Sequence, residues 1–338
     1  MGKARQANEP LEQRHKDLAR SIQVMYEEAF FHLLAHLHKK YPSENLVLAG
    51  GCAYNSVANG KIHKRSPFKN SYIQSASGDA GGAIGSAFAV WFEQGNRARE
   101  CEMNHAYLGP QFGAPAIEDL LARSREDIRG QNCNVTHMSD EGELCRRVAT
   151  AISEGKVVGW FQGRMEWGPR ALGNRSILGD PRRADMKDIL NLKIKRRESF
   201  RPFAPSILRE AVPEWFTDED DVPFMMKVFP IREEKRAQIP AVTHVDGSGR
   251  LQTIERAANP RYYRLIEEFA KISGVPIVLN TSFNENEPVV CRPEEALACF
   301  LRTKMDMLVM GDHVVERSQA PVDALRSPSQ NRAAAPAP

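Results

Sequence analysis

The stretch Gly163–Arg182, GRMEWGPRALGNRSILGDPR, spaces arginines and glycines only a few residues apart. The apolar run Lys156–Phe161 precedes it and has the composition of a β-strand. Arginine grips oxyanions with a planar pair of donors, and glycine lets the backbone approach a ligand closely. A strand that leads into such a loop favours an oxyanion-binding site; a solvated basic surface loop is the alternative.

Length and composition are those of an ordinary water-soluble protein with about two domains. The chain has 338 residues, of which 42% are hydrophobic and 26% charged, and its net charge is +3. That charge is too small to argue for nucleic acid by itself. The six cysteines form no CxxC pair, which favours reduced thiols over a disulfide or metal framework. No apolar run is long enough to cross a bilayer, and the polar N-terminus lacks a secretion signal, so we expect a cytoplasmic protein.

The segment from Leu11 to Lys40 predicts a long amphipathic helix, because apolar residues recur at three- and four-residue steps. His32 and His36 fall on one face of it, a spacing that can bind metal. No glutamate follows His32 in the metalloprotease manner. We therefore favour a helix that is merely rich in histidine near its C-terminal end, where positive charge suits the helix dipole.

Two glycine-containing loops follow in the first third of the chain. Residues 45–49 predict a buried strand that ends at Gly50 and Gly51 before a helix of small residues, an arrangement that suits a phosphate or ribose near a helix N-terminus. A tight turn is the plainer interpretation. In the second loop, which opens the helix within Ser75–Ala87, Asp79 could ligate a metal or accept a hydroxyl proton; its other possible role is a helix N-cap.

The second half of the chain alternates expected helices and strands. Helices are expected at 142–154, 186–195, 262–272 and 292–302, and strands at 225–228, 276–279 and 307–310. The residues from 316 onward are rich in alanine, proline, serine and arginine, which is typical of a disordered tail.

Three further polar groups lie between these elements. Lys195, Arg197 and Arg201 are closely spaced and could bind an anion, or could be a basic helix end. His244 and Arg250 flank a glycine turn, which suits an acid/base and anion cluster or a decorated hairpin. Asn280–Asn284 follows a buried strand, where hydroxyl and amide groups commonly face a ligand.

These motifs, together with LAGGCAYNSVANGKI and SASGDAGGAIGSA, resemble those of the O-carbamoyltransferases that modify nodulation factors and antibiotics. The resemblance runs from about residue 10 to 316. It implies that residues 1–101 are the second lobe of an actin-like ATPase domain whose first lobe is absent. It further implies a linker at 102–134, a YrdC-like α/β domain at 135–316 and a disordered tail at 317–338.

The resemblance also implies a two-step reaction. The YrdC-like domain would form carbamoyl adenylate from carbamoyl phosphate and ATP with Mg²⁺, and the ATPase-like domain would pass the carbamoyl group to a hydroxyl of a small-molecule acceptor. The implied catalytic residues are Arg170, Lys195, Arg197 and His244. The implied substrate- and ATP-binding residues are Arg164, Asn174, Arg175, Ser176, Arg201, Arg250, Asn280, Thr281, Ser282 and Asn284. In the ATPase lobe, Gly50, Gly51 and Asn55 would contact nucleotide, and Asp79 would ligate a metal.

The absent lobe limits what this chain can be expected to do. A half-fold normally exposes a large apolar face, so the chain is either truncated or completed by a separate chain. A divalent metal such as Fe²⁺ would bind at Asp79 only if the missing lobe were supplied. The first half-reaction is expected to survive, whereas the second would need a partner.

Two other classes of protein remain open. The first is a non-catalytic accessory protein that binds a nucleotide or RNA. Trp167 is the aromatic residue in the arginine-rich stretch, which weakens recognition by base stacking, so nucleic acid is not favoured. The second is an inactive truncated fragment. Salt-sensitive RNA binding without ATP turnover would identify the first, and a neighbouring reading frame with an HxxxH element would argue against the second.

Overall fold

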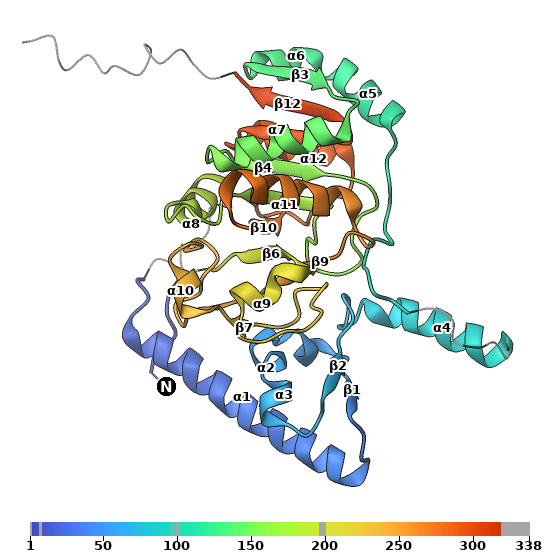
Figure 1. Ribbon diagram of the computed structural model, residues 1–338, viewed down its shortest axis with the longest axis vertical. Helices are drawn as coiled ribbons and strands as arrows, with labels where there is room; N and C mark the ends of the chain where they lie inside the picture. The colour runs from blue at the N-terminus through green and yellow to red at the C-terminus, as the bar shows by residue number, and fades with distance from the viewer. Residues whose placement is uncertain (1, 7–8, 96–97, 99–101, 196–200, 319–338) are drawn as a thin grey trace, which may run out of the picture.

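An eight-stranded mixed sheet forms the centre of the computed structural model, which describes residues 2–6, 9–95, 98, 102–195 and 201–318 (Figure 1). The strand order is β3-β12-β11-β4-β5-β10-β6-β9; the β11–β4 and β6–β9 pairs are parallel and the other neighbouring pairs antiparallel. The strands are β3 (Cys133–His137), β4 (Val158–Phe161), β5 (Arg175–Gly179), β6 (Ala204–Leu208), β9 (Gln252–Ile254), β10 (Ile277–Ser282), β11 (Met307–Met310) and β12 (His313–Arg317). The predicted α/β fold class is confirmed.

Two amphipathic helices, α7 (Glu141–Ser153) and α11 (Pro260–Ser273), pack side by side against this sheet (Figure 1). Asp140 caps α7 by accepting a hydrogen bond from the Glu143 N–H at 2.7 Å. Asn259 caps α11 in the same way at 3.1 Å, and Gly274 ends it in the left-handed conformation at φ 73°. These caps place the first turn of α11 beside the arginine-rich loop.

Shorter elements complete the C-terminal domain, defined here as residues 114–318. They are α5 (Ala114–Arg123), α6 (Arg125–Gly130), α8 (Met186–Asp188), the π-helical turn η2 (Ile189–Ile194), the 3₁₀ turn η3 (Arg209–Ala211), α9 (Val212–Trp215), β7 (Phe229–Pro230), α10 (Glu233–Arg236), β8 (Ser248–Gly249) and α12 (Pro293–Arg302). Helices α5 and α6 bury Ile117 and Ile128 in the main core, so residues within the 102–134 stretch belong to the packing of this domain.

The N-terminal region, defined here as residues 9–95, is built around one long helix. Its elements are α1 (Gln13–Lys40), β1 (Asn45–Val47), the 3₁₀ turn η1 (Gly51–Tyr54), α2 (Ser56–Asn59), α3 (Ile62–Arg65), β2 (Asn70–Tyr72) and α4 (Gly81–Gly95). A small core of Phe31, Leu34, Leu46, Ile62 and Phe68 joins α1 to the two-stranded parallel sheet β1–β2 and to α3. The buried Glu27 carboxylate accepts hydrogen bonds from Lys61 and Arg65 and ties the same helices together.

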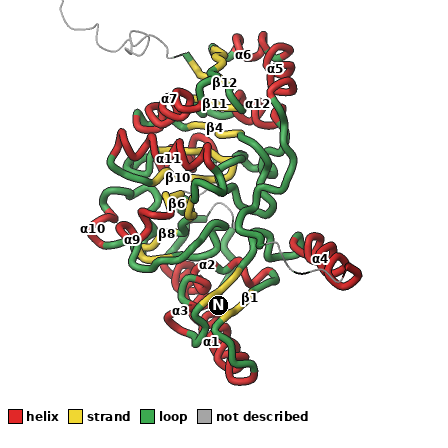
Figure 2. Tube along the Cα trace, turned by 45° about the vertical axis from the view of Figure 1, so that its right-hand side comes forward, coloured by secondary structure: helices red, strands yellow, loops and turns green. Residues whose placement is uncertain are grey.

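Large apolar side chains are exposed over much of the N-terminal region. Helix α4 projects from the rest of the protein in both Figure 1 and Figure 2, and its Val90 and Trp91 are 53% and 52% exposed. On α1, Met25 is 70% exposed, and Val47 of β1 is 72% exposed. An apolar surface of this extent is unusual for a region that packs against nothing further.

The N-terminal region meets the C-terminal domain through a short stretch of closely packed backbone. The Asn59 side chain donates hydrogen bonds to the carbonyls of Ala53 (2.7 Å) and Met226 (3.0 Å), and the Val228 N–H donates to the Ser56 carbonyl. A Cβ atom on Gly60 would lie 2.0 Å from the Val228 carbonyl oxygen. This joint therefore accepts only glycine at position 60, and it fixes the two parts against each other.

Some of the predicted elements are wrong in detail. The strand expected to be buried at 45–49 buries only Leu46 among its three strand residues. The strand expected at 225–228 is not formed, because Met225 takes a positive φ of 56° and these residues fill the joint between the two parts. The helix expected at 186–195 becomes a single turn followed by a π-helical turn. Among the described residues, no helix is both long and apolar enough to span a bilayer.

Candidate functional site

Lys195, Ser282 and Asn284 lie together at the end of β10, as expected of residues that share an anion site. Lys195 is 2% exposed, and its ammonium group donates to the Ser282 carbonyl at 2.5 Å and to Asn284 Oδ1 and the Asn284 carbonyl at 2.6 and 2.7 Å. Ser282 Oγ lies 3.3 Å from the ammonium and donates to Asn284 Oδ1 at 2.8 Å. The buried ammonium is thus fixed in position by oxygens of Ser282 and Asn284, and a preorganised cation of this kind can stabilise negative charge on a ligand.

The other members of the predicted basic segment are Arg197 and Arg201. Arg197 lies outside the described residues. Arg201 is exposed, and its carbonyl accepts a hydrogen bond from the Asn191 side chain at 3.3 Å. Their predicted roles stay predictions.

Asn280 belongs to a buried polar network that joins β10, β6 and β9. Its amide donates to Ser206 Oγ and Gln252 Oε1, both at 3.1 Å, and to the Ala171 carbonyl at 3.3 Å. Gln252 in turn donates to the Leu172 carbonyl at 2.8 Å. The network therefore holds the loop 167–174, the centre of the arginine-rich stretch, on the sheet. Thr281, next along β10, pairs with Ile177 of β5 and is half-buried.

Three of the predicted substrate-binding residues hold this loop from within. The Arg175 guanidinium is fully buried, donates to the carbonyls of Gln162 (2.6 Å) and Asn174 (2.9 Å), and stacks 3.7 Å from the centre of the Phe161 ring. The Asn174 amide donates to the Arg164 carbonyl at 2.7 Å, and Ser176 Oγ accepts from the Gly173 N–H at 3.0 Å. The structure gives these side chains intramolecular partners, and their contact with substrate stays a prediction.

Arg164 and Arg170 make fewer hydrogen bonds to described residues of the protein than Arg175 does. Arg164 is exposed and makes a long 3.4 Å contact with the Gly109 carbonyl. Arg170 is half-buried beside Tyr54 of the N-terminal region; its Nε is buried without a hydrogen-bond partner, and burial lowers the pKa of its guanidinium. An unsatisfied buried donor on a cation is an arrangement that an oxyanion would stabilise.

His244 and Arg250 lie close together around the predicted glycine turn. His244 Nδ1 is 3.2 Å from Ser248 Oγ, which donates to the Asp246 carboxylate at 2.6 Å. Burial lowers the pKa of His244 to about 4; Arg250 and Lys187 add to this effect, and Asp246 opposes it. The imidazole is therefore neutral at pH 7, as a general base must be.

This lowered pKa predicts a stability loss in acid. Because the unfolded chain binds a proton at His244 near its ordinary pKa of about 6.5, the unfolded state holds more protons between that pH and about 4. The contribution of His244 to the free energy of unfolding is therefore fully present above pH 6.5 and is lost as the pH drops toward 4. Urea unfolding at pH 7 and pH 5 should show the loss, and it should be smaller in His244→Gln; an equal loss in both proteins would contradict the assignment.

The two glycine-containing loops of the N-terminal region are joined to each other. The Gly50 N–H donates to the Ser77 carbonyl at 2.7 Å, and Gly50 takes a φ of 95°. A Cβ atom on Gly50 or Gly51 would meet no atom within 4 Å, so this turn is open to a ligand. The Asn55 side chain caps α2 through the Ala58 N–H at 3.1 Å, which is the plain structural role for that residue.

Asp79, the predicted metal ligand, is not part of a metal-ligating cluster among the described residues. Asp79 is exposed in a turn, and within the described part of the chain no three His, Cys, Asp or Glu side chains gather closely enough to hold a metal ion. His32 and His36 are both exposed on α1, which agrees with their structural interpretation. The described residues thus do not form a metal site by themselves.

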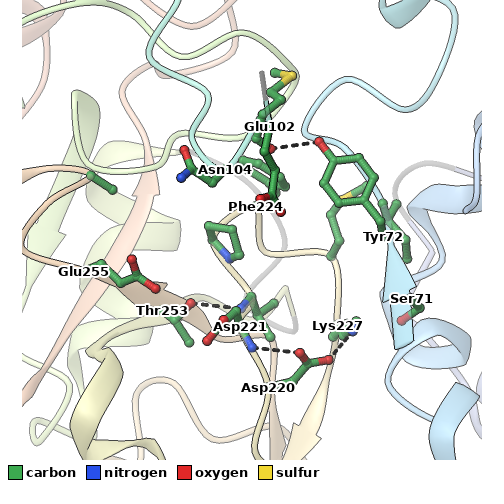
Figure 3. Close-up of a pocket in the computed structure, with 16 residues that line it drawn as sticks. Ser71, Tyr72, Glu102, Asn104, Asp220, Asp221, Phe224, Lys227, Thr253 and Glu255 are labelled. Carbon is green, nitrogen blue, oxygen red and sulfur yellow. Dashed lines mark hydrogen bonds and ion pairs between the residues drawn. The ribbon is translucent and has the colours of Figure 1, made fainter. Parts of the chain in front are cut away.

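A cavity of about 350 Å³ lies between the N-terminal region and the C-terminal domain, and none of the predicted site residues lines it (Figure 3). Tyr72 lines one side of it, and Glu102, Glu255 and Asp220 add carboxylates. Burial alone would raise the pKa of Asp220, but a hydrogen bond from His63 and the charge of Lys227 outweigh it and lower that pKa to about 2. The cavity is acidic, so it does not suit the anionic substrates that the arginine-rich loop would bind.

Several residues that organise the site were not predicted. Ser206 and Gln252 carry the polar network beneath the loop, and the Tyr107 hydroxyl donates to the Leu172 carbonyl at 2.8 Å. Glu166 lies inside the quoted stretch and accepts three backbone hydrogen bonds. An acidic residue among arginines and glycines is the one signal that could have drawn attention to it.

Comparison with known proteins agrees with the resemblance. A family model described as the carbamoyltransferase C-terminus matches residues 149–317, and one described as the carbamoyltransferase N-terminus matches residues 2–88. Nodulation protein NolNO of Sinorhizobium fredii is 43% identical over 92% of this chain and 45% of its own length. The 3'-hydroxymethylcephem-O-carbamoyltransferase of Amycolatopsis lactamdurans is 31% identical over 88% of this chain and 54% of its own length.

Among solved structures, full-length HypF in its phosphate- and nucleotide-bound form matches with a TM-score of 0.37 and 18% identity, over 55% of this chain and 22% of that one. The chain spans about half the length of the curated relatives that it matches. The two family models and the identity to these relatives establish that the chain belongs to the carbamoyltransferase family.

Proposed function

We propose that the C-terminal domain forms carbamoyl adenylate from carbamoyl phosphate and ATP. Hydrolysis of carbamoyl phosphate would release carbamate and inorganic phosphate. A carbamate oxygen would then attack the α-phosphorus of ATP, and pyrophosphate would leave. The observation that carries this proposal is the buried ammonium of Lys195, held by Ser282 and Asn284 at the end of β10.

The chain's own groups have distinct roles in this reaction. Lys195 would neutralise charge that develops on the transferring phosphoryl group, a form of stabilisation worth several kcal/mol in enzymes. Arg170 and Arg250 would bind the anionic ends of the two substrates. Neutral His244 would accept a proton from the attacking water. Magnesium is expected to enter with ATP, because it bridges phosphate oxygens.

The acceptor is proposed to be a small molecule with a hydroxyl group. One relative is named for transfer to the hydroxymethyl group of a cephem, and this chain is 31% identical to it. The acceptor oxygen would attack the carbonyl carbon of carbamoyl adenylate, and AMP would leave. We assign this step to the side of the protein formed by the Gly50–Gly51 turn, which is open to a ligand.

The transfer of the carbamoyl group to the acceptor is proposed to need polypeptide in addition to the 338 residues of this chain. About half the length of the relatives lies outside it, and α1, β1 and α4 expose large apolar side chains that further chain could cover. Asp79 would ligate a divalent metal such as Fe²⁺ only together with ligands from that further polypeptide.

Exchange of labelled pyrophosphate into ATP tests the first step. We expect exchange that requires both the protein and carbamoyl phosphate, because carbamate must be present before the α-phosphate is attacked. Protein that unfolds cooperatively but catalyses no exchange under these conditions would refute the proposed function.

A further inference from the structure

The Glu166 carboxylate closes the arginine-rich loop on itself. Its side chain is buried, with the residue 5% exposed, and Oε1 accepts hydrogen bonds from three backbone N–H groups. The donors are Leu172 at 2.7 Å, Asn174 at 2.7 Å and Arg175 at 3.2 Å. We call these three contacts the Glu166 clamp. One carboxylate oxygen therefore sets the course of the chain on both sides of Gly173.

The clamp also places the Glu166 carboxylate beside a buried guanidinium; burial raises the pKa of Glu166, and the backbone donors and the charge of Arg175 oppose that effect. The Arg175 guanidinium is enclosed by backbone carbonyls; burial lowers its pKa, and the charge of Glu166 opposes that effect, which leaves the pKa at about 10. A loop whose backbone donors converge on an internal carboxylate cannot offer those donors to a phosphate. The N–H groups of Leu172, Asn174 and Arg175 are therefore not available to a ligand, and a side chain of the loop would have to make that contact.

Arg170 is the residue of the clamped loop that is placed to do this. It lies between Glu166 and Leu172, and its Nε is buried without a partner beside Tyr54. On the inner side, the carbonyls of Ala171 and Leu172 accept hydrogen bonds from Asn280 and Gln252. The clamp thus fixes Arg170 relative to the polar network of the sheet.

We propose that Glu166 is a positioning residue for carbamoyl phosphate. It holds loop 167–174 so that Arg170 faces the phosphate group of that substrate. This inference rests on the proposed function. Loss of the clamp should weaken substrate binding through Arg170 without removing Lys195, so the Michaelis constant should rise while turnover of the bound substrate is largely kept.

The test compares Glu166→Ala, Glu166→Gln and the wild type. In the alanine variant, hydrogen exchange of the loop amides should accelerate by about tenfold or more, because their acceptor is gone. The KM for carbamoyl phosphate in pyrophosphate exchange should rise by about tenfold, with kcat within about threefold. Glutamine keeps an acceptor oxygen. In the Glu166→Gln variant, the exchange rates of the loop amides and the KM should therefore stay within about threefold of the wild-type values.

A matched control and a binding measurement separate the clamp from general damage and from the proposed function. Glu268→Ala removes another buried carboxylate, on α11, and should leave the KM unchanged. Calorimetry with inorganic phosphate needs no turnover and should show binding about tenfold weaker in Glu166→Ala than in wild type. Absence of pyrophosphate exchange in the wild type would refute the proposed function, while this binding comparison would still decide for or against the clamp.

Two results would overturn the positioning role. One is a Glu166→Ala protein with loosened loop amides but unchanged KM and phosphate affinity. The other is an alanine variant whose loop amides stay protected. If the alanine variant does not fold, Glu166→Asp replaces it, since a side chain shorter by one methylene cannot reach the same donors; equal KM values in the Asp and Gln variants would then refute the proposal.

Discussion

Replacing Lys195 with methionine should lower carbamoyl-phosphate-dependent pyrophosphate exchange by about 100-fold or more. Methionine fills nearly the same volume but carries no charge. A preorganised buried donor aimed at developing charge contributes about 10²–10³ in rate. The variant also removes one hydrogen-bond donor from each of three oxygens, the Ser282 carbonyl, the Asn284 carbonyl and Asn284 Oδ1, which should cost about 1–3 kcal/mol of stability.

The control for this variant is Lys271→Met. Lys271 is an exposed lysine on α11, paired with Glu268 at 2.8 Å, and its loss should leave the stability of the protein nearly unchanged. Initial rates of exchange and thermal unfolding should be measured on both proteins. A folded Lys195→Met variant that exchanges as fast as the Lys271→Met control would remove Lys195 from the mechanism.

The Gly173→Ala substitution in the arginine-rich loop should be strongly destabilising. Gly173 takes a φ of 107°, and an added Cβ would lie 2.2 Å from Cδ1 of Tyr262, a fully buried ring in the first turn of α11. A positive φ costs alanine about 1 kcal/mol, and overpacking a core costs about 1–3 kcal/mol more. We therefore expect a loss of about 2–4 kcal/mol in urea unfolding.

Gly274→Ala provides the comparison that isolates the packing contribution. Gly274 also has a positive φ, of 73°, at the C-terminal end of α11, but a Cβ there would meet no atom within 4 Å. That variant should lose only about 1 kcal/mol, from its backbone conformation alone. Equal losses at the two positions would mean that Tyr262 and the loop are not packed as described.

The sequence predicted the central elements of the C-terminal domain because their patterns are local. Helices α7 and α11 have strong apolar periodicity and side-chain caps, and β4 and β10 are short apolar runs bounded by polar residues. The edge strand β3 and its neighbour β12 were missed, because they contain Asn134, Thr136 and Glu316 among few apolar residues and gain order from pairing with each other.

For the candidate site, the sequence indicated which residue types come together but not the directions of their side chains; their contact with substrate stays a prediction. Lys195 and Ser282 were expected to meet and do so, because both belong to motifs at the ends of regular elements. Arg175 was grouped with the ligand-facing arginines, yet it points inward to carbonyls. Sequence spacing cannot tell an arginine that binds substrate from one that holds a loop, because both need glycines and polar neighbours. Glu166 was overlooked for the same reason.

The most direct test of the central claim is a single-turnover reaction with enzyme in excess over ATP, quenched and analysed by mass spectrometry. The proposed function predicts that carbamoyl adenylate and pyrophosphate appear together, in equal amounts, only when carbamoyl phosphate and Mg²⁺ are both present. Folded protein that leaves ATP intact under these conditions, or that releases pyrophosphate without carbamoyl adenylate, would contradict it.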